Sequence, residues 1–439
     1  GSLSIVGGPD RLLEPVTKWC NRATSPTTLY EQVMQAGELA QRIPQGPTYL
    51  SVPIENMVHE WTPPKRARKA PPPTRTRAID TDIENVAHAL ANAKNPIVQT
   101  EAAGRDQACF DALVALCDAL ALPVFENNQG KGSNFPKNNK MHQGFSIEPH
   151  LDAADVALVV RSRSPWYPPS AGPHNAQVIA IDEAPLDDTM VYQSLQATSY
   201  LEGDVATTLT LLLKAVQRIG VDAAKITQRR KRLEAAHDDR QKINTQTLEK
   251  VSSDKVIHPA YLASRLSAVL PKNACYVDET TTHRITLQNF LQWDQAFDYV
   301  KVPTGLGQGL GVALGVKLGM RDRLIVSVIG DGGFLYNPIP QSLGVARDEN
   351  LPIMVVIFNN GEYRAMKNNQ LSYYPDGVGK QSGIFLGAEI NSVNYDEMVL
   401  PFGGVGIKVE DPTKLDDALI DGMKAVEEGK TAIINVIVS

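Results

Sequence analysis

Two apolar runs rich in valine and isoleucine constrain the fold more than any other feature of the chain. LIVSVIGD spans residues 324–331 and PIMVVIFNN spans residues 352–360. Continuous runs of this kind are typical of parallel strands that are buried on both faces. PIPQSLGVARDE, residues 338–349, lies between them and is long enough for a crossover helix. The segment therefore predicts a right-handed βαβ unit, in which both strands end at the same edge of a sheet.

The same pattern recurs over most of the 439 residues and predicts an α/β fold with doubly wound parallel sheets. Residues 256–439 also contain the apolar runs NACYVD and TAIINVIV, so we expect one such domain there. Residues 81–215 alternate helical and strand patterns, which predicts a second, central α/β domain. The charged, helix-prone residues 216–255 are expected to connect the two domains.

The first 60 residues contain little more than one helical pattern, at 27–43, and one strand pattern, at 47–54. This is a poor core for an independent domain, so we expect the end of a larger one. Residues 61–80 are rich in proline and basic residues and predict an extended linker. No aromatic residues alternate with the basic ones to stack on bases, which favours a solvated connector over a nucleic-acid site.

Composition restricts the environment in which the protein is expected to work. The net charge is −6 and 21% of residues are charged, which gives no support for nucleic-acid binding. The four cysteines form no C-x-x-C pair, so we expect a reducing, cytoplasmic setting. No apolar run reaches the roughly 20 residues that span a bilayer, and the start GSLSIVGG has no signal-peptide pattern, so we expect no membrane association.

Two polar residues end the paired apolar runs, and their chemistry suggests a site. Asp331 ends the first run and Asn360 the second, and in a parallel sheet both face the carboxyl edge where ligands bind. One carboxylate and one amide oxygen suit Mg²⁺, and Gly332 and Gly333 let the backbone approach a phosphate closely. Either turn alone is usually structural, but the pair at this spacing predicts a magnesium-bridged diphosphate.

The sequence GDG, followed after 26 residues by NN, resembles the cofactor motif of thiamine diphosphate enzymes. Residues 305–332 and 349–363 are similar to acetolactate synthases and benzoylformate decarboxylases around this motif. Residues 122–144 and 176–185 resemble the central domain of that family, and residues 14–19 and 46–56 the end of its pyrimidine-binding domain. The resemblance implies thiamine diphosphate and Mg²⁺ as cofactors, with 256–439 as the domain that binds them and 1–60 as a remnant of the pyrimidine-binding domain.

The resemblance also implies roles for individual residues. Mg²⁺ is expected at the side chains of Asp331 and Asn360 and at the backbone carbonyl of Glu362. The residues expected to contact the cofactor are Thr281, Thr282, Leu306, Gly332, Gly333, Asn360, Glu362 and Tyr363. Leu306 would support the bent cofactor from below, although the sequence alone suggests a core residue, and Thr281 and Thr282 would also suit a helix N-cap.

Three further expectations concern the chemistry around this cofactor. His283 is a candidate for substrate contact or proton transfer, although a lone histidine is more often structural. Arg364 stands where the family often has glycine, and it would pair either with a substrate carboxylate or with a surface acid. No G-x-G-x-x-G fingerprint occurs, so we expect neither FAD nor a nucleotide-dependent oxidoreductase.

The family activates its cofactor with a glutamate early in the pyrimidine-binding domain, and no residue here matches that position. We therefore expect a second polypeptide, separately encoded or produced by cleavage, to supply it, unless the chain is truncated. The family also implies an oligomer. The activity implied is decarboxylation of a 2-keto acid, with an acetolactate synthase-like carboligase as the alternative. A non-catalytic member is a third possibility, which the intact Asp331 and Asn360 pair argues against.

Overall fold

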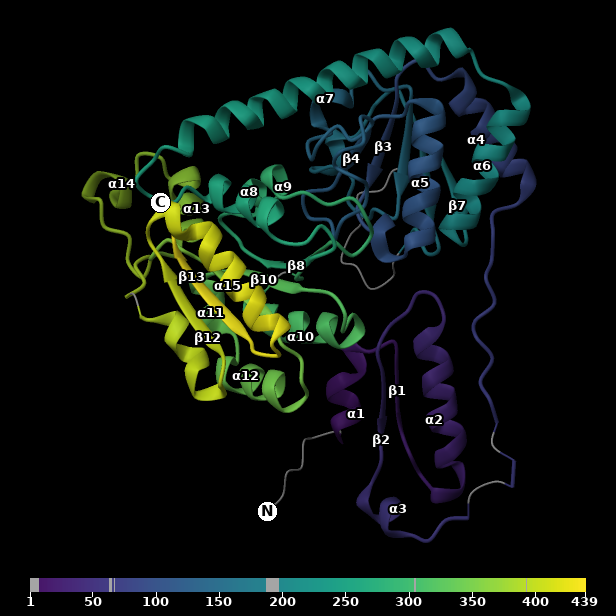
Figure 1. Cartoon of the computed structure of the whole chain (residues 1–439). Coiled ribbons are helices and arrows are strands. Elements are labelled where there is room, and N and C mark those ends of the chain that lie inside the picture. Colours follow the sequence, from purple (N-terminus) through teal and green to yellow (C-terminus); the bar gives the residue numbers. More distant parts are fainter. Residues whose placement is uncertain (1–7, 63–64, 67, 187–196, 304, 392) are drawn as a thin grey trace.

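The computed structural model describes residues 8–62, 65–66, 68–186, 197–303, 305–391 and 393–439. Its named strands form three parallel sheets, one in each of three units that follow one another along the chain (Figure 1). The predicted α/β class with parallel sheets is thus confirmed. None of the helices in these described ranges is long and apolar enough to cross a membrane.

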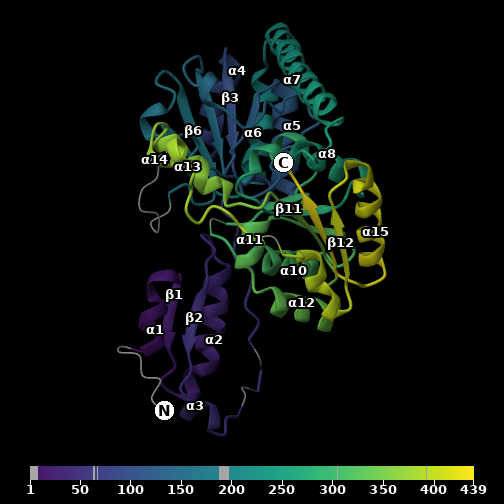
Figure 2. The same cartoon turned by 90° about the vertical axis from the view of Figure 1, so that its left-hand side faces the viewer.

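The N-terminal unit has a two-stranded sheet and three helices. These elements are β1 (Trp19–Arg22), β2 (Thr48–Ser51), α1 (Gly8–Leu13), α2 (Pro26–Gln41) and α3 (Ile54–Val58). Ala23 is the only fully buried residue among those described here between 8 and 62. Figures 1 and 2 show the unit to one side of the larger sheets, and residues 68–79, which lead to the central unit, belong to no helix or strand.

The central unit is a five-stranded sheet with strand order β4-β3-β5-β6-β7. Its strands are β3 (Pro96–Thr100), β4 (Val124–Glu126), β5 (Val156–Val160), β6 (Gln177–Asp182) and β7 (Ser199–Glu202). Its helices are α4 (Asp80–Asn92), α5 (Gln107–Leu120) and α6 (Val205–Ile219). Each face of the sheet packs into its own apolar cluster. The strands are therefore buried on both sides, which explains their continuous apolar sequences.

A long helix, α7 (Ala223–Val251), runs along the outer side of the central unit and reaches the third one (Figure 1). Its buried residues Arg229, Leu233 and His237 recur every four positions, so a single face packs inward. The Arg229 guanidinium donates hydrogen bonds to the carbonyls that end α4 and α5. The connecting helix is therefore packed and hydrogen-bonded against the central unit.

The third unit is a six-stranded sheet with strand order β12-β13-β11-β10-β8-β9, covered on both faces by apolar clusters. Its strands are β8 (Cys275–Glu279), β9 (Tyr299–Lys301), β10 (Ile325–Gly330), β11 (Met354–Asn359), β12 (Val405–Val409) and β13 (Ala432–Ile437). Its helices are α8 (Pro259–Val269), α9 (Arg284–Phe290), α10 (Gly309–Gly319), α11 (Asp331–Tyr336), α12 (Ile339–Asp348), α13 (Arg364–Tyr373), α14 (Val378–Ser382) and α15 (Leu415–Glu427). Strands β8, β10 and β11 are neighbours, so the loops that follow them meet at one edge.

Candidate cofactor and metal site

The ends of β10 and β11 bring Asp331, the first residue of α11, next to the loop that carries Asn360. Gly330, the last residue of β10, pairs with Phe358 of β11. The Asp331 carboxylate crosses to the neighbouring loop, where Oδ2 accepts a hydrogen bond from the Gly361 N–H at 2.9 Å. Asn360 Oδ1 accepts from the Glu362 N–H at 3.0 Å. The two side chains thus accept hydrogen bonds from consecutive backbone N–H groups, and they lie close together as the topology of a parallel βαβ unit predicted.

Burial shapes the electrostatics of this acid. Asp331 is only 2% exposed, and desolvation raises the pKa of its carboxyl group. The N–H groups of Gly332 and Gly361 and the charge of Arg364 oppose that rise. A buried carboxylate beside an amide oxygen is a donor set that suits a hard divalent cation such as Mg²⁺. Among the described residues, no cluster of three or more His, Cys, Asp or Glu side chains offers an alternative centre.

The loop after β8 reaches the same place. His283 is buried, and its Nε2 lies 3.2 Å from Asn360 Nδ2. Burial, together with Arg364 and His258, lowers the pKa of His283 to about 4, so its ring is neutral at neutral pH. Thr281 is exposed and Thr282 is half-buried just before it. Three predicted positions therefore lie on a loop that contacts Asn360.

Glycine is required where α11 begins. A Cβ atom on Gly332 would lie 2.5 Å from Cε1 of Tyr363, and one on Gly333 would lie 3.3 Å from the carbonyl oxygen of Glu279. The ring of Tyr363 therefore packs directly against the backbone at the end of β10. This ring also meets Tyr336 edge-on, with centroids 6.3 Å apart. Gly332 and Tyr363 are therefore in contact, and their expected role in binding a cofactor stays a prediction.

Leu306 lies between two glycines with left-handed backbone, Gly305 at φ +117° and Gly307 at φ +95°. A Cβ atom on Gly307 would lie 2.6 Å from the carbonyl oxygen of Tyr336, so this loop packs against the end of α11. Leu306 itself is 42% exposed, so it is not a core residue. A partly exposed leucine between two glycines of left-handed backbone, which glycine adopts freely, is suited to contact a ligand.

The side chain of Glu362 has other partners. It pairs with Arg364 at 2.6 Å and with Lys367 at 3.0 Å. Burial acts to raise the pKa of Glu362, but these two cations lower it below its usual value. Arg364 therefore pairs with a neighbouring acid, one of the two partners that the sequence left open. The Glu362 carboxylate is thus occupied by two cationic side chains, and the expected role of its backbone carbonyl stays a prediction.

Two residues at the site were missed by the sequence analysis. Glu279 is 6% exposed, and its carboxylate accepts from the N–H groups of Gln308 and Gly309 at 2.8 and 3.0 Å and from Asn337 Nδ2 at 2.7 Å. Asn337 Nδ2 also donates to the Gly333 carbonyl at 2.9 Å. These bonds fix the Leu306 loop and α11 to the end of β8. Two consecutive acids, Asp278 and Glu279, at the end of a buried strand were the available signal.

Among the described residues, four buried hydroxyls have no hydrogen-bond partner, those of Thr100, Ser199, Ser327 and Tyr395, and the last of these lies near Asp331. Tyr395 is fully buried, and its ring packs edge-on against Phe334 of α11 at 5.7 Å. Burial, reinforced by Asp331 and Tyr363, raises the pKa of Tyr395 to about 12, so the hydroxyl is a neutral donor. Unpaired buried donors in native proteins usually indicate a missing ligand or water. Together with the oxygen donors and the glycine cradle, this orphan hydroxyl fits a site for a metal and a phosphate group.

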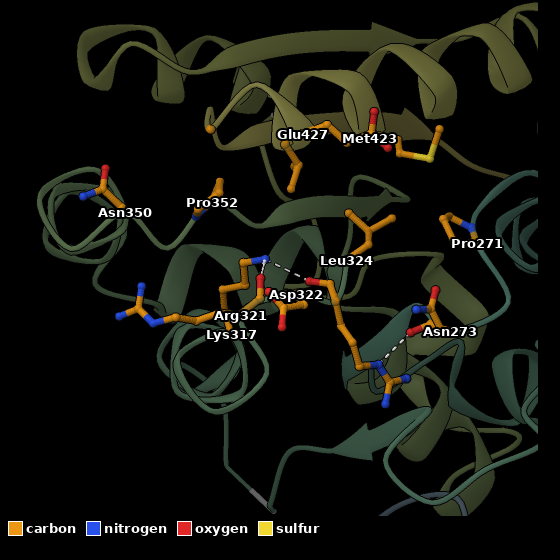
Figure 3. Close-up of a pocket in the computed structure, with 13 residues that line it drawn as sticks. Pro271, Asn273, Lys317, Arg321, Asp322, Leu324, Asn350, Pro352, Met423 and Glu427 are labelled. Atoms are coloured by element: carbon orange, nitrogen blue, oxygen red, sulfur yellow. Dashed lines mark hydrogen bonds between the residues drawn. The ribbon is translucent and has the colours of Figure 1, made fainter.

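A cavity of about 440 Å³ lies elsewhere on the same unit (Figure 3). It is lined by Asn273 and Leu324, which precede β8 and β10, and so lies at the amino ends of the strands, away from Asp331. Lys317 donates to the carbonyls of Arg321 and Arg323 at 2.6 and 2.9 Å, as the close-up shows. Because Lys317 already binds backbone carbonyls, this cavity does not offer a comparable ligand site.

These features define the class of protein. It has a doubly wound domain with an acid and an amide at neighbouring strand ends, and its glycines suit a diphosphate cofactor. Residues 279–436 match the family described as "Thiamine pyrophosphate enzyme, C-terminal TPP binding domain", so this part of the chain is a thiamine diphosphate-binding domain. Along most of its length the chain is also similar to an acetolactate synthase and to decarboxylases of 2-keto acids.

The chain is 26% identical to an acetolactate synthase of Bacillus subtilis, over 94% of this chain and 71% of that protein. It is 28% identical to a probable 2-ketoarginine decarboxylase, AruI, of Pseudomonas aeruginosa, over 83% of this chain and 64% of the relative. Its fold superposes with a TM-score of 0.78 on a thiamine diphosphate-dependent 4-hydroxybenzoylformate decarboxylase of Rhodococcus jostii, at 21% identity over 98% of this chain and 78% of the other. The last likeness concerns the fold alone.

Proposed function

We propose that the protein takes part in the decarboxylation of a 2-keto acid that depends on thiamine diphosphate and Mg²⁺. The observation that carries the proposal is the placement of Asp331 and Asn360 directly after the neighbouring strands β10 and β11 of a thiamine diphosphate-binding domain. Thiamine diphosphate, when bound, supplies an electron-accepting carbon for the electron pair that remains as CO₂ leaves. The chain itself supplies positions, charges and hydrogen bonds around that group.

Each residue has a separate part in this proposal. Asp331, Asn360 and the Glu362 carbonyl hold the cation. Gly332 and Gly333 let phosphate oxygens approach the backbone, and the hydroxyls of Thr281 and Thr282 bind them. Leu306 presses against the cofactor from the neighbouring loop, which Glu279 holds in place through its bonds to Gln308 and Gly309.

A carboligase is the second candidate, because the similarity to an acetolactate synthase extends over 94% of the chain. The two reactions begin in the same way and differ in whether a proton or a second carbonyl compound captures the product of decarboxylation. Analysis of the products from pyruvate and from larger 2-keto acids separates them. An aldehyde indicates a lyase, whereas a hydroxyketone or a 2-hydroxy-2-alkyl-3-keto acid indicates a carboligase.

We further propose that another polypeptide completes the site in an oligomer. The support is the exposure of apolar side chains on two parts of the described chain. Around the site, Leu335 is 41% and Tyr336 is 59% exposed, beside the partly exposed Leu306. In the N-terminal unit, two strands and their helices bury only Ala23, too little for independent stability. A partner that carries the rest of a pyrimidine-binding domain would cover both surfaces and bring the carboxylate that activates the cofactor.

Calorimetric titration of the natively purified protein with thiamine diphosphate tests the cofactor proposal. We expect saturable binding with MgCl₂ that is lost in EDTA and in Asp331→Asn, followed by CO₂ release from at least one member of a 2-keto acid panel. Binding that is indifferent to Mg²⁺ and to Asp331 would refute it. Intact-mass analysis of the native complex tests the second chain, and a mass that corresponds only to copies of this chain would exclude a separate partner.

A further inference from the structure

Asn360 is held at both ends of its amide group. The carbonyl end, Oδ1, accepts from the Glu362 N–H at 3.0 Å, while Nδ2 lies 3.2 Å from Nε2 of His283. His283 comes from the loop after β8, 77 residues away in the chain. It is 6% exposed, and its ring packs against Phe358 with centroids 5.7 Å apart. Its contact with Asn360 is therefore a fixed part of the packed structure.

The direction of this contact follows from elementary chemistry. An amide nitrogen only donates hydrogen bonds, so the ring nitrogen facing it must accept. An asparagine amide is nearly symmetric in shape, and a half-turn exchanges its oxygen for an NH₂ group that cannot bind a cation. The chain therefore needs a feature that prevents the half-turn. Outer-shell hydrogen bonds commonly perform this task for metal ligands.

We propose that His283 is a positioning residue that fixes the Asn360 amide with its oxygen directed toward the cation site shared with Asp331. The inference rests on the proposed binding of Mg²⁺ and adds a residue that sets the geometry of a ligand. It gives His283 a role distinct from substrate contact or proton transfer. A turned amide would lose the bond to the Glu362 N–H, and it could pair with His283 only if the ring moved its proton to Nε2.

Variants at position 283 distinguish the effect of the hydrogen-bond acceptor from the effect of the size of the side chain. His283→Leu keeps an apolar body of similar size and removes the acceptor, whereas His283→Gln offers a carbonyl oxygen in its place. The measurement is the Mg²⁺ concentration needed for half-maximal thiamine diphosphate binding, followed by calorimetry in natively purified protein. We expect His283→Leu to raise this concentration about 10-fold, as loss of outer-shell partners does elsewhere, and His283→Gln to stay within about 3-fold of the unaltered protein.

The matched control is the same change in an Asn360→Asp background. A carboxylate has two equivalent oxygens, so no orientation remains to be fixed and His283→Leu should have less than about a 2-fold effect there. An equal loss in both backgrounds, or unchanged Mg²⁺ dependence in His283→Leu, would overturn the inference. An equal loss in both backgrounds would mean that His283 merely stabilises the loop. An unchanged Mg²⁺ dependence in His283→Leu would leave proton transfer as its only role. Failure of the proposed function has a different signature, because the unaltered protein would then show no Mg²⁺-dependent binding at all.

Discussion

Asp331 has a carboxylate whose burial is unfavourable in the absence of a cation. It is 2% exposed, desolvation raises its pKa, and backbone N–H groups offset this only in part. Asparagine keeps an oxygen for the Gly361 N–H and removes the charge. We therefore expect Asp331→Asn to raise the melting temperature of the cofactor-free protein, by roughly 2 °C for a gain near 1 kcal/mol.

The same variant should lose the further rise in melting temperature that thiamine diphosphate and Mg²⁺ give to the unaltered protein. Thermal scans with and without both ligands measure the two effects together. The opposite melting behaviour is expected if Asp331 contributes only to the stability of the fold. In that case Asp331→Asn would melt earlier and would still respond to the ligands.

The burial of the Tyr395 hydroxyl is also unfavourable in the cofactor-free protein. This hydroxyl is buried and has no partner in the described part of the chain. An unpaired buried donor costs about 1–3 kcal/mol, so Tyr395→Phe should stabilise the cofactor-free protein by on the order of 1 kcal/mol in urea unfolding. If the hydroxyl meets a phosphate oxygen or a metal-bound water, the same change should weaken thiamine diphosphate binding about 5-fold. Stabilisation with unchanged affinity would show that the hydroxyl serves no ligand.

Among the structural elements, the loop before α10 depends on a single carboxylate. Glu279 accepts three hydrogen bonds that hold Gln308, Gly309 and Asn337. Glu279→Ala leaves these donors unpaired in a buried place, and we expect a loss of about 2–4 kcal/mol in urea unfolding. Hydrogen exchange at residues 305–310 should increase with it. Glu349→Ala, an exposed acid at the end of α12, is the control and should change stability by less than about 0.5 kcal/mol.

The helix α7 should make stability depend on pH. His237 Nδ1 lies 3.2 Å from the His142 carbonyl oxygen, and burial lowers the pKa of both histidines below its usual value of 6.5. A histidine with a depressed folded pKa stabilises the protein above its unfolded pKa, and this stability is lost as the pH falls. We expect the melting temperature to drop from pH 7 to pH 5. His237→Gln, which cannot titrate but can donate to the same carbonyl, should reduce the drop, and an unchanged drop would exclude this histidine as a cause.

Sequence patterns predicted some elements better than others, for physical reasons. The runs that became β5, β6, β10 and β11 lie inside their sheets, where burial on both faces produces an unmistakable apolar run. Strands β1, β7, β9 and β12 were missed because they are short or partly exposed edge strands. The proximity of Asp331 and Asn360 follows from topology alone. The contacts of Glu279 with Asn337 and of His283 with Asn360 do not, because they join loops 58 and 77 residues apart.

At the scale of the whole molecule, buried polar contacts join the central unit to the thiamine diphosphate-binding unit. Glu126 of β4 accepts hydrogen bonds from His142 Nε2 at 3.1 Å and from Trp293 Nε1 at 3.3 Å. Lys137 donates to the carbonyls of Gln288, Asn289 and Leu291 at the end of α9. Since α9 begins directly after His283, the central unit supports the helix from which the site loop extends.

Lys137 offers a direct test of this connection. Its amine lies 4.5 Å from the ring centre of Trp293, and burial lowers the pKa of Lys137 to about 7. A neutral amine still donates two hydrogen bonds, so the junction remains intact above that pH without a buried charge. Lys137→Met keeps the apolar stem and leaves the carbonyls unpaired. We expect a loss of about 2 kcal/mol in urea unfolding at pH 9.

The pH dependence of that loss identifies its cause. Between the folded pKa of about 7 and the usual lysine value of 10.5, the unfolded chain binds more protons at Lys137 than the folded protein does, so stability rises with pH. The methionine variant lacks this rise, and the stability difference between the two proteins should therefore grow from pH 6 to pH 9. Lys140→Met, at an exposed lysine paired with Asp238, should show no such trend. A difference that stays constant with pH would mean that Lys137 is fully charged in the folded protein, held by its three carbonyls.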